Sequence, residues 1–361
     1  MTLRDQRQNE FAKTWLKWRF GILDLYPRFG KIYVTINILE TMPDNIDILI
    51  AYPDKEIEKS WKTDFKKRGY NNPNITYTSH LSLHKYQDKK FDLVIIDEIH
   101  LLSDAQIDAT KMLLFLNRDV LGLTGTLSIW TEKKLLQQLG LKVVGYYPME
   151  QGIEEGIVVD YEITVFKVPL DNIKRGMFKK PERTEAKQFS ALSWVINQKV
   201  MNGEGANTLF LRLSRMRIIQ SSEAKRLKTI ELLRTYKDER VLVFCGVTKI
   251  ADNLGIPSYH NKVKEKHIFE DFANGEGNQL AVVKIGNSGV TYKPLNKVII
   301  NYFDSNSENL AQKINRCMGM EYDTLDKKAN IFIICTNEAV EQKWLDKALE
   351  FFDKDKIKYI K

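Results

Sequence analysis

Residues 91–100 of the chain read Phe-Asp-Leu-Val-Ile-Ile-Asp-Glu-Ile-His. The part from 91 to 96 is almost continuously apolar, which is typical of a central strand that is covered on both faces. Asp97 and Glu98 follow directly, at the carboxyl end of that strand, where ligands bind in open α/β sheets. The stretch therefore predicts a largely parallel sheet with an acidic site at its edge.

The same alternation of short apolar runs and longer amphipathic segments continues through most of the chain, and it predicts βα units. In the first half we expect strands at 21–25, 47–51, 75–77, 91–96 and 120–123, and helices at 32–41, 55–68, 104–116 and 131–139. In the second half we expect strands at 240–245, 279–284, 297–302 and 330–335, and helices at 221–235, 262–273, 307–318 and 338–352.

The length of 361 residues suits about two domains. The alternation of apolar and amphipathic segments weakens between 149 and 207, where a strand-like run at 161–168 precedes a basic, proline-containing stretch. We therefore expect a first α/β domain over residues 1–148, a connection over 149–207 and a second α/β domain over 208–361.

The composition is that of an ordinary globular protein, with 43% hydrophobic and 28% charged residues. The formal net charge of +8 suits a polyanionic partner, because clustered Lys and Arg release counterions from a phosphate backbone. Many basic proteins bind no nucleic acid, so the charge alone does not establish such a partner.

The three cysteines, Cys245, Cys317 and Cys335, are far apart and lack metal-ligand spacing. Cys245 and Cys335 lie in apolar, strand-like runs, which indicates buried thiols in a reducing compartment. The chain begins without an apolar signal core, and no apolar run approaches the roughly 18 residues that a membrane span needs. We expect a cytoplasmic protein without a membrane partner.

The acid pair has a chemical interpretation. One carboxylate at a strand end can hold Mg²⁺ through water, and its neighbour can polarise an attacking water, as phosphoanhydride hydrolysis requires. The alternative is a solvated helix start, where the helix dipole also favours acids.

A second motif lies upstream, where the strand at 21–25 runs into Tyr26-Pro27-Arg28-Phe29-Gly30-Lys31 and then into a helix. This layout is typical of a phosphate-binding loop, in which backbone N–H groups cradle the phosphates and the lysine neutralises them. The alternative is an ordinary turn, because the usual first glycine is absent and Ile32 replaces the hydroxyl that would ligate Mg²⁺. The order of this loop before Asp97 favours phosphate binding.

A third strand, 120–123, ends in Thr124-Gly125-Thr126. Hydroxyls at this point could relay the state of a nucleotide from the acid pair, or they could belong to a simple turn.

Taken in order, these motifs resemble those of superfamily 2 DExH-box helicases, and the chain looks closest to compact phage-type or XPB/UvsW-like enzymes. The resemblance extends from Gln8 to Arg316 and rests on Gln8, Gly30-Lys31, Asp97-Glu98-Ile99-His100, Thr124-Gly125-Thr126, a motif IV-like strand at 240–245, a motif V-like run at 287–292 and a motif VI-like run at 312–316.

The resemblance implies two RecA-like lobes of the P-loop NTPase type, with mainly parallel sheets, which bind ATP and Mg²⁺. In the first lobe Gln8 would read the adenine, Lys31 would hold the β- and γ-phosphates, Asp97 would position Mg²⁺ and Glu98 would activate water. The phosphate loop would comprise Phe29, Gly30, Lys31 and Ile32, and His100 and Thr124 would couple the nucleotide to the lobe interface.

In the second lobe Gly289 and Thr291 would approach the ribose and the nucleic acid. Gln312 and Arg316 would reach the nucleotide from this lobe, with Arg316 as an arginine finger. The motif VI-like run departs from the family pattern at Asn315 and at Gly319, where a glycine and a second arginine are usual. These departures, with Ile32, put the rate of hydrolysis in doubt.

The resemblance implies an ATP-dependent helicase or translocase that hydrolyses ATP at the cleft between the lobes and moves on a DNA or RNA strand. The implied partner is single-stranded or branched DNA rather than RNA, with an accessory protein, and the enzyme type suggests a phage or virus gene. One alternative is a nucleic-acid-binding module on a catalytically weakened helicase fold. Another is a small-molecule kinase, against which the second-half motifs argue.

Nucleic-acid contacts are expected in the loops at 52–55, 79–80 and 246–249. The basic run at 212–217 is a further candidate contact, and the alternative, which we favour, is a solvated helix face with apolar positions packed inward.

Overall fold

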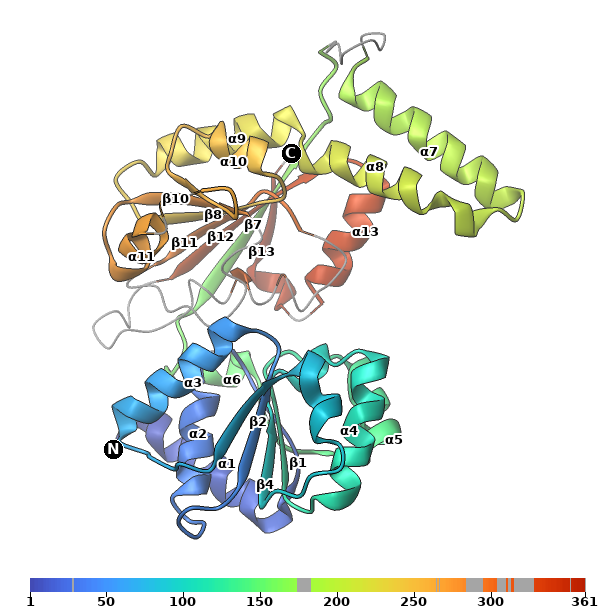
Figure 1. Cartoon of the computed structure of the whole chain (residues 1–361). Coiled ribbons are helices and arrows are strands. Elements are labelled where there is room, and N and C mark those ends of the chain that lie inside the picture. Colours follow the sequence, from blue (N-terminus) through green and yellow to red (C-terminus); the bar gives the residue numbers. More distant parts are fainter. Residues whose placement is uncertain are drawn as a thin grey trace. The chain divides into compact units, whose positions relative to one another are not determined.

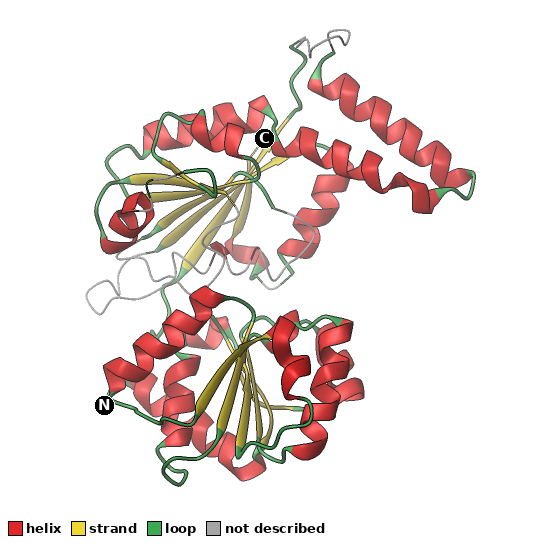
Figure 2. Ribbon diagram, in the orientation of Figure 1, coloured by secondary structure: helices red, strands yellow, loops and turns green. Residues whose placement is uncertain are grey.

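The computed structural model describes residues 1–27, 29–173, 183–263, 265, 267–283, 295–303, 310, 313–314, 328–350 and 352–360. These residues form two compact units, one over Met1–Val159 and one from Asp160 onward (Figure 1). Each unit is a parallel sheet flanked by helices (Figure 2), so the expected α/β class is confirmed.

The sheet of the first unit has the strand order β3-β2-β4-β5-β1-β6, and all of its pairs are parallel. Its strands are β1 (Phe20–Leu25), β2 (Ile48–Tyr52), β3 (Ile75–Ser79), β4 (Leu93–Ile96), β5 (Val120–Thr124) and β6 (Val143–Tyr147). Its α-helices are α1 (Leu3–Trp18), α2 (Lys31–Leu39), α3 (Lys55–Arg68), α4 (Asp104–Leu116), α5 (Ile129–Leu139) and α6 (Met149–Glu154).

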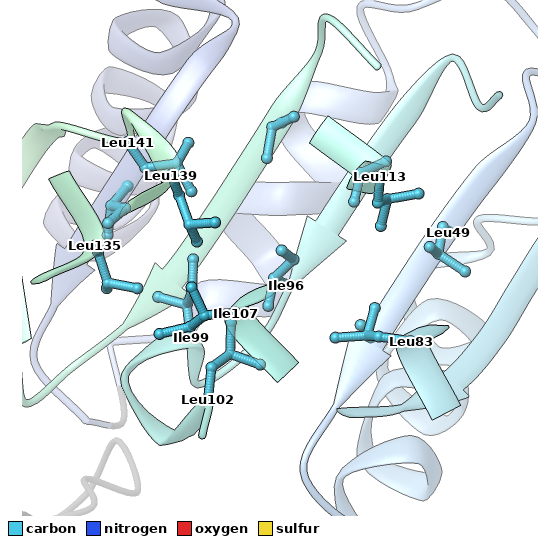
Figure 3. Close-up of a cluster of buried hydrophobic side chains, with 14 residues drawn as sticks. Leu49, Leu83, Ile96, Ile99, Leu102, Ile107, Leu113, Leu135, Leu139 and Leu141 are labelled. Carbon is cyan, nitrogen blue, oxygen red and sulfur yellow. The ribbon is translucent and has the colours of Figure 1, made fainter. Parts of the chain in front are cut away.

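β4 is the buried central strand that its sequence predicts, and every residue of Leu93–Ile96 is buried. Ile96 packs with Leu113 of α4 and Leu135 of α5 in a cluster that covers one face of the sheet (Figure 3). Full burial of each such side chain contributes about 1.5–3 kcal/mol to the free energy of folding. This core therefore fixes the strand that precedes the acid pair.

The second unit contains a seven-stranded parallel sheet of order β13-β7-β12-β11-β8-β10-β9. Its strands are β7 (Tyr161–Val168), β8 (Val241–Cys245), β9 (Ser258–Tyr259), β10 (Gln279–Val283), β11 (Lys297–Ile300), β12 (Ala329–Thr336) and β13 (Ile357–Ile360). Its α-helices in the described ranges include α7 (Glu185–Met201), α8 (Leu209–Gln220), α9 (Glu223–Thr235), α10 (Thr248–Asp252), α11 (His267–Asn274) and α13 (Ala339–Ala348).

The segment 149–207 differs from the connection that the sequence suggests. The units divide after Val159, and β7 is an interior strand that pairs with β12 along its whole length. The parallel partner of β7 is distant in the sequence, so no local pattern reveals the pairing. The rest of the segment contains α7, a helix that the sequence pattern does not predict.

Helices α7 and α8 form a pair that extends away from the sheet of their own unit (Figure 1). Its base is held by a small cluster in which Phe189 and Ile219 pack with Leu170, Val340 and Trp344.

The free thiols of Cys245 and Cys335 are buried, as expected, and Cys317 lies outside the described residues. The helix expected at 307–318 falls mostly outside them as well. Within the described ranges, no helix is long and apolar enough to cross a membrane.

Candidate active site

The carboxyl ends of β1, β4 and β5 bring the first-half motifs to one edge of the sheet. β5 lies between β4 and β1, so the segments that follow these three strands begin side by side. The segment after β1 supplies Lys31 and the segment after β4 supplies Asp97 and Glu98, while Thr124 is the last residue of β5 itself.

Lys31 is the first residue of α2, and its Nζ lies 3.1 Å from Oε1 of Glu98. Burial alone would lower the pKa of the Lys31 ammonium, but the charges of Glu98 and Asp97 outweigh burial and raise it. Burial likewise opposes ionisation of Glu98, but Lys31 and the other neighbouring groups lower the pKa of this carboxyl overall. The two side chains therefore form a charged pair at the start of a helix, where an anion is also favoured.

The phosphate loop is held from behind by α1. The Gln8 side-chain amide donates a hydrogen bond of 2.8 Å to the carbonyl of Phe29, and Arg4 Nε donates one of 3.1 Å to the same oxygen. Gly30 has a φ of 96°, and a Cβ there would lie 2.5 Å from Nε2 of Gln8. Glycine is therefore required by both the backbone conformation and the close approach of Gln8.

Phe29 and Ile32, the other two described residues assigned to nucleotide binding in this loop, offer no side-chain group suited to phosphate. The Phe29 ring is fully buried in an aromatic cluster with Phe11, Tyr26 and Tyr147, so only its backbone borders the loop. Ile32 lies in the first turn of α2 and offers no hydroxyl.

The turn after β5 packs against the phosphate loop at Gly125. A Cβ on Gly125 would lie 2.6 Å from the carbonyl oxygen of Leu25 and 2.9 Å from the nitrogen of Pro27. The two motifs are thus in direct backbone contact, which the sequence alone does not show.

Asp97 is buried, and three neighbours fix it. Its Oδ1 accepts the backbone N–H of Glu98 at 3.0 Å, and its Oδ2 accepts the indole N–H of Trp61 at 2.8 Å. Nε2 of His80 lies 2.9 Å from its carbonyl oxygen. Burial and the Glu98 charge raise the pKa of Asp97, and Lys31 partly offsets them.

Glu98 adopts a left-handed backbone conformation, with φ at 47°. A non-glycine residue in this region costs on the order of 1–3 kcal/mol, and such strain is concentrated at functional sites. This conformation accompanies the placement of the carboxylate, with Oε1 near Lys31 and Oε2 3.5 Å from His100 Nδ1.

His100 links the acid pair to the turn after β5, because its Nδ1 lies 2.9 Å from Oγ1 of Thr124. Burial lowers the pKa of His100 to about 4, so its ring is neutral at pH 7. Among the described residues, Nε2 of His100 and Oγ1 of Thr126 are buried polar atoms without a hydrogen-bond partner. Buried polar atoms without a partner are uncommon in folded proteins, and a water, an ion or a catalytic role can account for them.

The structure corrects one expected nucleic-acid contact. His80 is 3% exposed and its ring nitrogen is directed at the Asp97 carbonyl, so its side chain supports the site from inside. Burial lowers the pKa of His80 to about 4.

Two residues of the site were missed by sequence reasoning. Trp61 comes from the middle of α3 and contacts Asp97. Asp24 interrupts the apolar run of β1 one residue before the strand ends, and burial raises the pKa of its carboxyl to about 7 although Lys31 acts against this. An acid inside an otherwise apolar strand was an available signal for Asp24, whereas nothing local marks Trp61.

The predicted second-half residues Gly289, Thr291, Gln312 and Arg316 lie outside the described residues. β8 is present as expected and leads through Gly246 into α10. In α8, Arg215 lies over the Phe189 ring at 5.6 Å and donates to Ser193, so this member of the basic run packs within the helix pair.

Comparison with known proteins identifies related folds. No family model matches the chain. It is 23% identical to the DNA 3'-5' translocase XPB2 of Sulfurisphaera tokodaii, over 92% of this chain and 81% of that protein.

Two solved structures are similar along nearly the whole chain. A fragment of a putative HsdR subunit of a type I restriction enzyme from Vibrio vulnificus has a TM-score of 0.62 and 14% identity, and covers 98% of this chain and 67% of that chain. The Hef helicase domain of Pyrococcus furiosus has a TM-score of 0.53 and 13% identity, and the match covers 94% of this chain and 97% of that chain. The chain has the fold of a helicase core. Both units are RecA-like.

Proposed function

We propose that the chain is an ATP-dependent nucleic-acid translocase or helicase with a DExH-type, P-loop ATPase site. The observation that carries the proposal is the Lys31–Glu98 pair beside the buried Asp97, at the carboxyl edge of a parallel sheet. XPB2 is by its name a DNA 3'-5' translocase, which supports DNA as the polymer, and we propose a single-stranded or branched form of it.

In this proposal Lys31 exchanges its bond to Glu98 for the β- and γ-phosphates of ATP, which releases the carboxylate. Before nucleotide binds, Glu98 is ionised, because Lys31 and the other groups around it outweigh burial and keep its pKa low. In the proposed step Glu98 accepts a hydrogen bond from the attacking water.

The charges of the site fit a divalent cation. Among the described residues, Asp24, Asp97 and Glu98 supply carboxyls around the Lys31 ammonium, whereas His80 and His100 are neutral at pH 7. Mg²⁺ usually binds through one or two carboxylates together with substrate phosphates and water, and Asp97 would hold it here. Bound Mg²⁺ would neutralise the charge that develops on the phosphoryl oxygens.

His100 and Thr124 would transmit the change at Glu98, since their bond joins the acid pair to the turn that packs on the phosphate loop. Gln312 and Arg316 are proposed to complete the site, with Arg316 stabilising transition-state charge.

Steady-state ATP hydrolysis with Mg²⁺, measured with and without single-stranded DNA or RNA, tests the proposal. We expect stimulation by one polymer, and a loss of at least about 100-fold in turnover for Glu98→Gln, since a general base typically contributes that much. Binding of ATP by the variant is the control, and it should persist.

Hydrolysis no faster than in Glu98→Gln, with nucleic acid still bound, would contradict the enzymatic proposal. The chain would then be a nucleic-acid-binding module on a weakened helicase fold, as Ile32 and Gly319 would suggest.

A further inference from the structure

Trp61 forms a buried hydrogen bond to the acid pair from an element that carries none of the predicted site residues. It lies in the middle of α3, it is completely buried, and its indole N–H donates to Oδ2 of Asp97 at 2.8 Å. Its ring is held edge-on against Phe65, with ring centroids 5.5 Å apart. The position of the donor is therefore set by packing as well as by the hydrogen bond.

The bond fixes the rotation of the Asp97 carboxylate. Oδ1 already accepts the backbone N–H of Glu98, so each oxygen has one donor and the plane of the group is defined. A carboxylate oxygen can accept about two hydrogen bonds or ligands, so each keeps a further lone pair. Those free lone pairs have a defined direction only while both donors are present.

This matters because residue 32 supplies no hydroxyl. In phosphate loops the residue after the lysine usually ligates Mg²⁺ through a Ser or Thr oxygen, and here that residue is Ile32. More of the metal's coordination then depends on Asp97. Removing a residue that orients a metal ligand typically lowers metal affinity 10- to 100-fold.

We propose that Trp61 is a positioning residue that orients Asp97 for the Mg²⁺ of the bound nucleotide. The inference rests on the proposed ATPase function, and it concerns a residue that contacts neither nucleotide nor metal.

The test compares the affinity for the non-hydrolysable analogue AMP-PNP with Mg²⁺ and in EDTA, by calorimetry on the full chain. Mn²⁺ binding in the presence of AMP-PNP, followed by electron paramagnetic resonance, gives a second readout that does not depend on turnover. Trp61→Phe should lose about tenfold or more of the affinity gained with Mg²⁺, and should bind Mn²⁺ correspondingly more weakly. Its affinity in EDTA should stay within about twofold of wild type, since only the metal ligand is disturbed.

Trp15→Phe is the matched control. Trp15 is also fully buried in the same unit, and its indole N–H donates to a backbone carbonyl, that of Val120, at 3.2 Å. This variant should keep the wild-type increase in AMP-PNP affinity that Mg²⁺ produces. Asp97→Asn should abolish the gain, and adding Trp61→Phe to it should have no further effect.

If Trp61→Phe is too unstable to purify, replacement of Trp61 by β-(3-benzothienyl)alanine removes the N–H and keeps the ring shape. Wild-type metal dependence in either Trp61 variant would overturn the positioning role and leave the proposed function intact. Absence of any gain with Mg²⁺ in the wild-type protein would instead overturn the proposed function, and this inference with it.

Discussion

Asp24 shows how far a single side chain at this sheet edge departs from its behaviour in water. It is the second-last residue of β1, its chain neighbours Leu23 and Leu25 are apolar, and it is 8% exposed. Burial raises the pKa of its carboxyl from 3.8 to about 7, and the Glu132 and Glu98 charges add to this effect while Lys31 opposes it. The folded protein thus retains a proton on Asp24 at pH values where the unfolded chain has lost it.

The sign of the resulting pH dependence follows from proton binding. Between pH 4 and pH 7 the folded state binds more protons at Asp24 than the unfolded state does, so stability falls as pH rises through this range. Asp24→Asn removes the titrating group and keeps its shape. We expect the variant to be more stable than wild type at pH 8, by about 1–3 kcal/mol, and to show a smaller difference at pH 4.5. Urea unfolding at the two pH values measures this, and an equal difference at both would contradict it.

At the scale of elements, a buried ion pair joins two helices of the second unit. Lys225 of α9 and Glu341 of α13 lie 2.7 Å apart, with side chains 1% and 0% exposed. Glu341 also accepts bonds of 2.7 Å from the N–H and from the hydroxyl of Thr336, at the end of β12. The pair therefore ties both helices to the end of a sheet strand.

Lys225→Met should destabilise the second unit by about 3–5 kcal/mol, because it leaves a buried carboxylate without its partner. Adding Glu341→Gln removes the unpaired charge and should restore most of the lost stability. Thermal unfolding of wild type, both single variants and the double variant forms the measurement. If the double variant is the least stable of the four, unpaired charge is not the cause of the loss.

The element boundaries show which parts of the fold are determined by the local sequence. The helices at Lys55–Arg68 and Asp104–Leu116 have the predicted bounds, because amphipathic spacing and flanking residues are local signals. β7 and α7 were assigned to a connection, since the pairing of β7 with β12 joins residues far apart in the chain. The site followed the same rule. Asp97, Glu98 and Lys31 were marked by their neighbours, whereas the contact of Trp61 with Asp97 depends on how α3 packs.

At the scale of the whole molecule, the net charge of +8 should govern the strength of nucleic-acid binding more than that of nucleotide binding. Exposed charges are screened by salt, whereas buried groups such as Lys31 are screened much less. We expect affinity for single-stranded DNA to fall steeply with salt between about 50 and 200 mM, with a logarithmic slope of about −0.7 per phosphate contact. AMP-PNP affinity should change far less over the same range.

Lys249 gives this expectation a local test. It is exposed at the start of α10, in the loop where a contact with the phosphate backbone is predicted. Lys249→Ala should reduce the magnitude of the salt slope by about 0.7. Lys358→Ala is the control, because Lys358 is an exposed lysine on β13 of the same unit, paired at 2.9 Å with Glu162. If the two variants change the slope equally, the effect is one of overall charge and the loop at 246–249 does not contact the strand. If only Lys249→Ala changes it, the basic excess includes a defined contact with the backbone of the nucleic acid.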